Sequence, residues 1–444
     1  MKYTKYLLLL LLLASCASKR TVNKHRSYQA DTRPAVPATV QVAMPVVEEE
    51  EVDEPEPVLS ARPLVSQVHR FPAGTWQAAK QQALDSLCLS PLFETTQLGL
   101  YVYDLTDGEP LYAVNAAHRM RPASCQKVVT AITALHFLKD NYQLKTDFLI
   151  RGRVNAGILN GDLIVVGGMD PLVSAEELLQ AAASIRQQQG IESIAGNIVY
   201  DFSMREDAPY GWGWCWDDDY GPLSALLVDG KDGFEQKWNE TMEMAGIKVK
   251  EPQQLSHKGK EQKGTVVYSI RHGIDELLEP MMKNSDNIYA ECLFYQTAAT
   301  KGKKGAGRKE AAQRTEELLK SIGLDSNQYK VADGSGLSLY NYVSAEMLVA
   351  MLGYAWRNEK IKAHLLPSLP IAGYDGTLQK RMTGTVAEGN VHAKTGTVTG
   401  ISSLAGYLTA VNGHTLAFAI INQGISTSSI GRTFQDKVCE ELCK

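Results

Sequence analysis

Apolar residues follow a helical spacing near the start of the folded part of the chain, and strand-like segments come directly after it. Behind Thr75, a suitable helix cap, apolar positions at helical spacing predict a first helix that reaches Leu87. Residues 98–105 and 111–114 have the composition of strands, and Thr106-Asp107-Gly108 forms a turn signal between them. The pattern therefore predicts a helix followed by a strand pair.

The C-terminal end of the chain has a similar pattern in the opposite order. Residues 401–409 and 415–421 predict two strands, and Asn412-Gly413 between them is a strong hairpin signal. A last helix is predicted after these strands, because apolar residues recur there at helical spacing on one face. That face carries Ile430, Phe434, Val438 and Leu442.

One predicted helix, which begins at Ser124, has apolar residues all around its axis and should lie in a core. Terminal helices, terminal strands and a buried central helix predict an α/β (α+β) fold with an antiparallel sheet flanked by helices. Between residues 147 and 268 the pattern changes to short apolar pieces separated by Gly and Asp turns. We expect an inserted second domain at 147–268, within a first domain made of 73–146 and 269–444.

The N-terminus has the pattern of an export signal. Lys2 and Lys5 precede the leucine run 7–13, which is too short to span a bilayer. The stretch that ends at Cys16 resembles a lipoprotein signal, so residues 1–16 predict a signal peptide and Cys16 a lipid attachment site; an ordinary cleaved signal is the alternative. Residues 17–72, rich in Pro and Glu, predict a disordered tether. The expected location is the periplasmic side of a bacterial membrane, held by the lipid anchor.

Charge and cysteine usage exclude several classes of function. The formal net charge of −5 is not that of a protein that binds nucleic acid. The cysteines beyond Cys16 show no zinc spacing. We therefore expect no metal, no cofactor and no nucleic-acid partner.

Three short motifs carry the candidate chemistry. They are Ser124-Cys125-Gln126-Lys127, Ser285-Asp286-Asn287 and Lys394-Thr395-Gly396. Three positions along a helix place Lys127 on the same face as Ser124, where an amine can activate the hydroxyl if its pKa is lowered. Burial and the nearby charge of Lys394 are expected to lower it.

The remaining motif residues have complementary expected roles. Ser285 is a plausible proton relay toward a leaving amine, and Asn287 a polar contact for substrate and lysine. The backbone N–H groups of Ser124 and Thr397 are the expected oxyanion donors. Each motif alone is weak, but the three in this order match a known signature of penicillin-binding proteins and class A β-lactamases.

Beyond these motifs, the chain resembles the class C, low-molecular-mass penicillin-binding proteins, the D-alanyl-D-alanine carboxypeptidase/endopeptidase family. The resemblance runs from about Leu98 to Gln423. It rests on residues 121–124, 167–172, 221–226, 333–338, 373–378 with Arg381, and 403–407. It implies a serine β-lactamase/penicillin-binding transpeptidase-like fold, peptidoglycan stem peptides as substrate and β-lactams as covalent inhibitors.

The resemblance also implies residue roles. Ser124 would be the acyl-enzyme nucleophile, Lys127 its base and Ser285 the second proton carrier. The substrate's terminal carboxylate would be held by Lys394, Thr395, Gly396 and Thr397. Asp170, in the turn Gly168-Met169-Asp170-Pro171, would reach toward the substrate.

The chain departs from the family pattern in two places. Cys125 stands where the family usually has asparagine, and we expect only a packing change there. The family's β-rich third domain should follow Leu226, but a helix-like segment begins at Phe234, so that domain is expected to be absent.

The resemblance places the first and last helices side by side, which raises the hypothesis of a disulfide between Cys88 and Cys439 or Cys443. Three free thiols are the alternative.

Two other functions remain open at this stage. A β-lactamase of the same superfamily would need a deacylating carboxylate, for which Glu316 and Glu317 are remote candidates. A non-catalytic cell-wall-binding protein is the second alternative, although a binding protein has no need of a base beside a serine.

Overall fold

The computed structural model describes residues 68–218, 221–249, 254–257, 262–300 and 305–444, with no side-chain description for 254–257. The chain divides into two units, Met1–Ala61 and Arg62–Lys444. Everything below concerns the second unit, so the predicted signal peptide and Cys16 lie outside the described residues. Among the described residues, none of the helices has the length and apolar character needed to cross a membrane.

The first sheet is antiparallel throughout and has the strand order β10-β11-β12-β1-β2. Its strands are β1 (Gln97–Asp104), β2 (Glu109–Val114), β10 (His392–Val398), β11 (Ile401–Thr409) and β12 (Thr415–Gln423). The N-terminal strand β1 pairs directly with the C-terminal strand β12, with Leu100 opposite Ile420. The sheet therefore joins segments from the two ends of the folded chain, and the expected hairpin at Asn412-Gly413 connects two of its strands.

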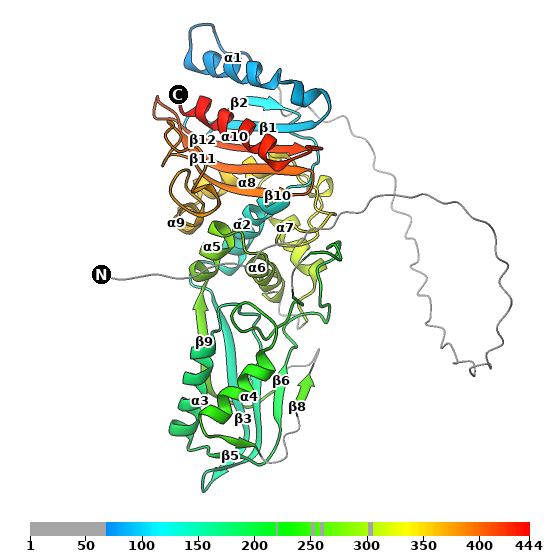
Figure 1. The fold of residues 1–444 in the computed structure, drawn as a ribbon, viewed down its shortest axis with the longest axis vertical. Coiled ribbons are helices and arrows are strands. Elements are labelled where there is room, and N and C mark those ends of the chain that lie inside the picture. Colours follow the sequence, from blue (N-terminus) through cyan, green and yellow to red (C-terminus); the bar gives the residue numbers. More distant parts are fainter. Residues whose placement is uncertain (1–67, 219–220, 250–253, 258–261, 301–304) are drawn as a thin grey trace, which may run out of the picture. The chain divides into compact units, whose positions relative to one another are not determined.

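Helices cover both faces of this sheet (Figure 1). On one face lie α1 (Trp76–Cys88) and α10 (Ser428–Cys443), whose apolar sides share a core with the sheet. On the other lie α8 (Ala345–Arg357) and α2 (Gln126–Leu138), and nearly every residue of α2 is buried. These observations confirm the predicted antiparallel sheet flanked by helices with a buried central helix.

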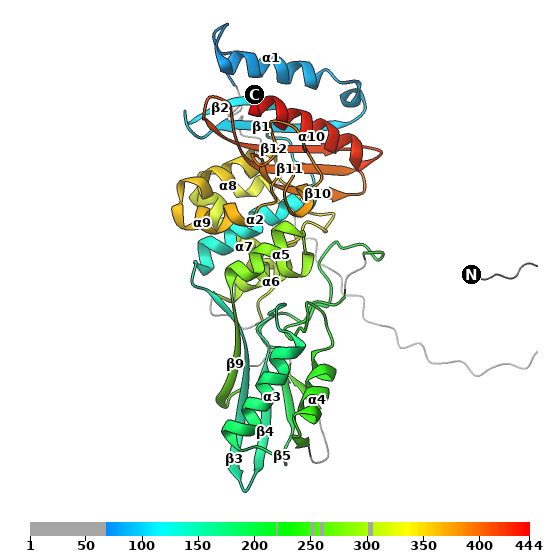
Figure 2. The ribbon, with the colours of Figure 1, turned by 60° about the vertical axis from the view of Figure 1, so that its left-hand side comes forward.

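Further helices surround α2. They are α5 (Ile274–Lys283), α6 (Asn287–Ala299), α7 (Arg308–Ser321) and α9 (Glu359–Ser368). Both views show α6 and α7 close to α2 (Figure 2). Short 3₁₀ turns lie at Pro91–Glu94, Ala123–Cys125, Ser326–Gln328 and Gly376–Leu378. Because α2 is enclosed by helices on one side and the sheet on the other, polar groups on it lie in a dry environment.

A second sheet lies between residues 143 and 273. Its strands are β3 (Gln143–Asn155), β4 (Ile158–Val166), β5 (Ser193–Ile194), β6 (Ile198–Asp201), β7 (Lys248–Val249), β8 (Gln254–His257) and β9 (Thr265–Gly273). The helices α3 (Ala175–Gln189) and α4 (Phe234–Met244) share a core with this sheet. The sheet extends a few residues beyond the predicted domain boundaries at 147 and 268, because β3 pairs with β9 from Gln143, opposite Gly273, onward.

The described residues between Leu226 and Ser285 form only α4, β7, β8, β9 and α5. Within this described part of the chain there is thus no third β-rich domain, as the sequence indicated.

The predicted disulfide is not formed, because Cys88, Cys439 and Cys443 are free thiols in this structure. The helices α1 and α10 do pack together, and Lys80 Nζ donates a 2.8 Å hydrogen bond to the Glu441 carbonyl oxygen. Cys88 lies eight residues beyond Lys80, or about 12 Å along the helix axis. The register of the two helices therefore separates the sulfur atoms.

Candidate active site

Ser124 lies on a tight 3₁₀ turn, Ala123–Cys125, immediately before α2 and not inside the helix itself. Two glycines allow neighbouring backbone to approach this turn. A Cβ on Gly336 would lie 1.9 Å from the Ala123 carbonyl oxygen, and one on Gly396 would lie 2.7 Å from that of Pro122. The turn is thus packed between β10 and the loop of residues 333–338, and Ser124 remains partly exposed.

Lys127 is fully buried and its Nζ has three close oxygen neighbours. Ser124 Oγ lies at 3.0 Å, Asn287 Oδ1 at 2.5 Å and the Ser335 carbonyl oxygen at 2.8 Å. The Asn287 and Ser335 oxygens can only accept hydrogen bonds. A neutral amine would give its two N–H groups to them and turn its lone pair toward the Ser124 hydroxyl. The geometry therefore suits a base that accepts the serine proton.

Burial lowers the pKa of Lys127 to about 8, although the charges of Asp333, Glu291 and Asp286 act in the opposite direction. None of these carboxylates is among the hydrogen-bond partners of the Lys127 amine. A substantial fraction of the amine is therefore neutral near physiological pH, as a general base requires.

Ser285 and Lys394 form a second pair. Lys394 Nζ donates 2.8 Å hydrogen bonds to Ser285 Oγ and to the Thr395 carbonyl oxygen. Ser285 has a left-handed backbone with φ of 63°, and Asp286 caps the N-terminus of α6 by accepting from the N–H groups of Ile288 and Tyr289. This corner holds Ser285 outside the helix while Asn287 begins it.

Lys394 is also completely buried. Burial lowers its pKa well below the usual range, and the charge of Lys127 lowers it further. The two lysines predicted from the motifs are thus brought together, and the charge of Lys127 disfavours the charged form of Lys394.

The other β10 residues lie along the edge of the first sheet. Thr395 Oγ donates a 2.7 Å hydrogen bond to Thr377 Oγ, and the Thr397 side chain is exposed. Gly396 packs against the turn that carries Ser124. Cys125 is buried and its thiol donates to the Lys394 carbonyl oxygen at 3.2 Å, so it ties the nucleophile turn to β10.

Two buried carboxylates support the site and were not among the predicted site residues. Glu291 Oε1 accepts from the N–H groups of Gly334 and Ser335 at 3.1 and 2.8 Å. Asp333 accepts from the N–H groups of Gly336 and Ser338 and from Trp214 Nε1. Together they hold the 333–338 loop so that the Ser335 carbonyl faces Lys127. A sequence signal existed for Glu291, which lies four positions after Asn287 in a segment rich in apolar residues.

Asp170 does not reach the substrate side of the site. Its carboxylate is fully buried, accepts from the Leu172 N–H at 3.0 Å and lies 2.8 Å from His272 Nδ1. The expected substrate contact is therefore replaced by contacts that close the turn after β4.

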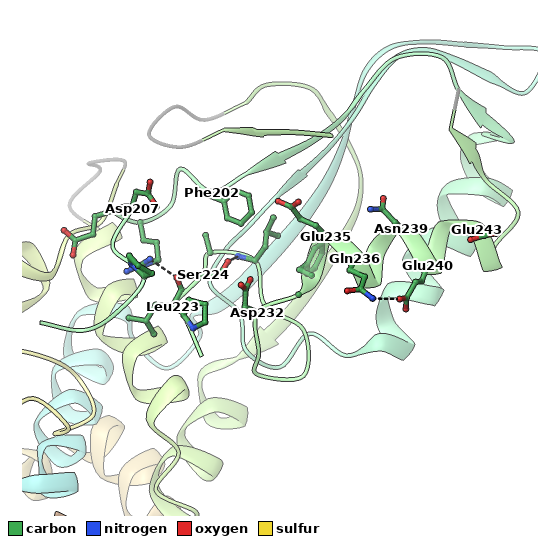
Figure 3. A pocket seen from close by; sticks show the side chains of 18 residues that line it. Phe202, Asp207, Leu223, Ser224, Asp232, Glu235, Gln236, Asn239, Glu240 and Glu243 are labelled. Carbon is green, nitrogen blue, oxygen red and sulfur yellow. Dashed lines mark hydrogen bonds between the residues drawn. The ribbon is translucent and has the colours of Figure 1, made fainter. Parts of the chain in front are cut away.

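The large cavity in Figure 3 is lined in part by residues of α4 and measures about 860 Å³. The acidic residues that line it include Asp207, Asp232, Glu235, Glu240 and Glu243. None of the three catalytic motifs contributes to its lining, so the serine site and this cavity are separate features.

Comparison with known proteins bears on this geometry. The model of the D-Ala-D-Ala carboxypeptidase 3 (S13) family matches residues 80–232 and 222–441. The D-alanyl-D-alanine carboxypeptidase DacB of Haemophilus influenzae is 27% identical over 420 residues, which cover 76% of this chain and 87% of that protein. A D-alanyl-D-alanine carboxypeptidase of Actinomadura sp. is 27% identical over 441 residues, covering 78% and 81%.

The crystal structure of penicillin-binding protein 4 from H. influenzae superposes with a TM-score of 0.74 at 24% identity. The superposition covers 81% of this chain and 98% of that one, which confirms the predicted fold class. The same protein complexed with a β-lactam superposes with a TM-score of 0.69 at 25% identity. On the family match, which spans most of the chain, this protein belongs to the D-Ala-D-Ala carboxypeptidase 3 (S13) family.

Proposed function

We propose that this protein is a serine-type D-alanyl-D-alanine carboxypeptidase that acts on peptidoglycan stem peptides through an acyl-enzyme. The observation that carries the proposal is the 3.0 Å contact between Lys127 Nζ and Ser124 Oγ, made by an amine whose other partners are neutral acceptors. The names of the H. influenzae and Actinomadura relatives support the same reaction.

In the acylation step, neutral Lys127 accepts the proton of Ser124 as Oγ attacks the carbonyl carbon of the penultimate D-alanine. The backbone N–H groups of Ser124 and Thr397 are the proposed donors to the developing oxyanion. The C–N bond then breaks, and the proton that Lys127 accepted is relayed through Ser285, which is hydrogen-bonded to Lys394, to the leaving amine of the terminal D-alanine, so that Lys127 is neutral again.

Water then attacks the ester carbonyl and gives a proton to neutral Lys127, which passes it to Ser124 Oγ as the ester bond breaks and the shortened peptide leaves. Asn287 holds Lys127 in place and offers its side-chain amide to the substrate. Thr395, Gly396 and Thr397 line the position proposed for the substrate's terminal carboxylate, beside Lys394.

A β-lactam presents a strained amide to the same serine, and we propose that it acylates Ser124. The H. influenzae protein has been crystallised in complex with a β-lactam. A β-lactamase function is less well supported, because among the described residues no hydrogen bond joins Ser124 to a carboxylate. Glu316 and Glu317 lie exposed on α7, where Glu317 pairs with Arg314. A purely binding role would leave the buried amine without a use.

Mass spectrometry after incubation with penicillin tests the proposal. The wild-type protein should gain one penicillin mass, on the peptide that contains Ser124, and Ser124→Ala should gain none. Ser86→Ala, which removes an exposed hydroxyl on α1, is the matched control and should acylate like wild type. Labelling of Ser124→Ala at another residue would refute the assignment of the nucleophile.

We also propose that the mature protein is lipid-anchored at Cys16 on the periplasmic side. The leucine run before Cys16 and the long polar segment after it support this location. The mature N-terminal peptide from native membranes should begin at Cys16 and carry acyl chains. A mature protein that begins elsewhere without an acyl mass would contradict the proposal.

A further inference from the structure

Arg432, on the C-terminal helix α10, faces the edge strand of the active site. Its Nη2 donates to Thr397 Oγ at 3.5 Å, and the side chain is exposed. This long contact leaves most of the five guanidinium N–H donors unused. Because Arg432 donates to the Thr397 oxygen, the Thr397 O–H remains available to donate to a ligand at the same edge.

The natural ion-pair partner of Arg432 is occupied by another residue. Asp436 lies four positions later on α10, a spacing at which opposite charges pair. Arg381 takes this carboxylate instead, with Nη2 and Nε at 2.6 and 2.9 Å from Asp436 Oδ1. In the part of the chain that the structure describes, no carboxylate lies within ion-pair distance of Arg432. Among the described residues, its charge therefore has no carboxylate partner.

A cation at this place would suit the substrate. A peptide that ends in D-alanine carries a terminal carboxylate, and a carboxylate that leaves water requires a charged or strongly hydrogen-bonding partner. The Lys394 amine already donates to Ser285 Oγ and the Thr395 carbonyl oxygen. The threonine hydroxyls supply hydrogen bonds but no charge.

Resting on the function proposed above, we propose that Arg432 is a specificity-determining residue that pairs with the terminal carboxylate of the substrate, together with the Thr397 hydroxyl. The planar fork of a guanidinium matches the two oxygens of a carboxylate. Arg381 is a positioning residue in this arrangement, since it holds Asp436 away from Arg432.

Two peptide substrates test the pairing: one that ends in D-Ala-D-Ala with a free carboxylate, and the same peptide with a C-terminal carboxamide. Arg432→Gln should lower kcat/KM for the free acid about 10- to 100-fold, the range expected for one lost charge-assisted hydrogen bond, and leave the carboxamide unchanged. Arg432→Lys should keep part of the preference, because it retains the charge but loses the fork.

The matched control is Lys437→Gln, which removes an exposed cation from the same helix and should leave kcat/KM unchanged for both substrates. An equal loss on both substrates, or no loss on either, would overturn the inference. Wild-type protein that cleaves neither peptide would overturn the proposed function itself, whereas cleavage with an unchanged preference in Arg432→Gln overturns only the role of Arg432.

A second variant tests the role of Asp436. In Arg381→Gln, Asp436 is released to pair with Arg432, so the preference for the free acid should fall. In the double variant Arg381→Gln with Asp436→Asn it should return, since no carboxylate then competes. If the preference does not return while thermal unfolding shows that the double variant is folded, the proposed competition is wrong.

Discussion

Lys127 in the catalytic region and His272 at the end of β9 are both buried bases, but their pKa values move in opposite directions. The pKa of Lys127 falls to about 8, mainly through burial. The pKa of His272 rises to about 9, mainly through its hydrogen bond to Asp170 and against the effect of burial. His272 lies between two carboxylates, with Asp170 at 2.8 Å and Glu177 at 3.0 Å.

The two pKa values move in opposite directions because the two side chains have different hydrogen-bond partners. The Lys127 amine contacts a hydroxyl, a side-chain amide oxygen and a peptide oxygen. The neighbouring carboxylates are not hydrogen-bonded to it. His272 contacts carboxylates directly. Burial by itself disfavours a charge, and only a direct counter-charge reverses that effect. The same interior can therefore keep one base neutral for chemistry and another charged to join β9 to the turn after β4 and to α3.

Removal of the Lys127 amine should have the largest effect. Lys127→Ala is expected to slow acylation of Ser124 by penicillin about 10²- to 10⁴-fold, the contribution of a general base. Stopped-flow or timed mass spectrometry measures the rate. Lys320→Ala, an exposed lysine on α7, is the control. An acylation rate for Lys127→Ala close to that of wild type would mean that another group takes the serine proton.

A carboxylate placed directly beside Lys127 should make its surroundings resemble those of His272. In wild type the acylation rate should rise as pH passes through about 8, where Lys127 loses its proton. Asn287→Asp should raise the Lys127 pKa, move this midpoint upward by about one pH unit or more, and slow acylation at pH 7 roughly 10-fold.

Asn160→Asp, which adds the same charge at an exposed position of the second sheet, is the control for Asn287→Asp. A midpoint that stays in place when Asn287 is changed would show that neutral partners are not what keeps the amine neutral.

Removal of the His272 charge should have the smallest effect on the reaction and act on stability instead. The contacts of protonated His272 raise its pKa from 6.5 to about 9 and so stabilise the folded state. This stabilisation is complete below about pH 6.5 and is lost as pH rises through about 9. It corresponds to about 3 kcal/mol at most. His272→Gln should therefore unfold at a lower temperature than wild type at pH 6, with a smaller difference at pH 10.

His364→Gln removes a histidine from the more open pair with Asp275 and serves as the control. A destabilisation by His272→Gln that is equal at both pH values would show that packing, and not charge, accounts for the effect.

Most of the catalytic geometry that the motifs predicted depends on local spacing. Ser124 and Lys127 are three positions apart at a helix start, so their contact follows from helix geometry once that helix forms. The antiparallel sheet was also predictable, because its strands and the Asn412-Gly413 turn have clear patterns. Asp333 and Ser335 lie in one of the segments that carry the family resemblance, but the sequence did not indicate their place in the site, since the Ser335 carbonyl meets Lys127 across 208 positions of sequence.

Two expectations failed because they depended on tertiary register. Asp170 lies in a turn whose sequence suggested a contact with the substrate. The pairing of Leu144 with His272 instead places the His272 side chain against the buried Asp170 carboxylate. Cys88 and the last helix do lie on the same face of the sheet, but the contact between Lys80 and Glu441 sets a register that separates the thiols.

The sequence by itself determined the residue types of the site, their order, and the local spacing that places a base beside a serine. Only the tertiary structure decided which groups surround that base, and those groups set its pKa. It also decided that Arg381 pairs with Asp436 and that Arg432, beside Thr397, has no carboxylate partner among the described residues. The physical reason is that helix spacing is a short-range property of the chain, whereas burial and charge pairing depend on segments that meet only after folding.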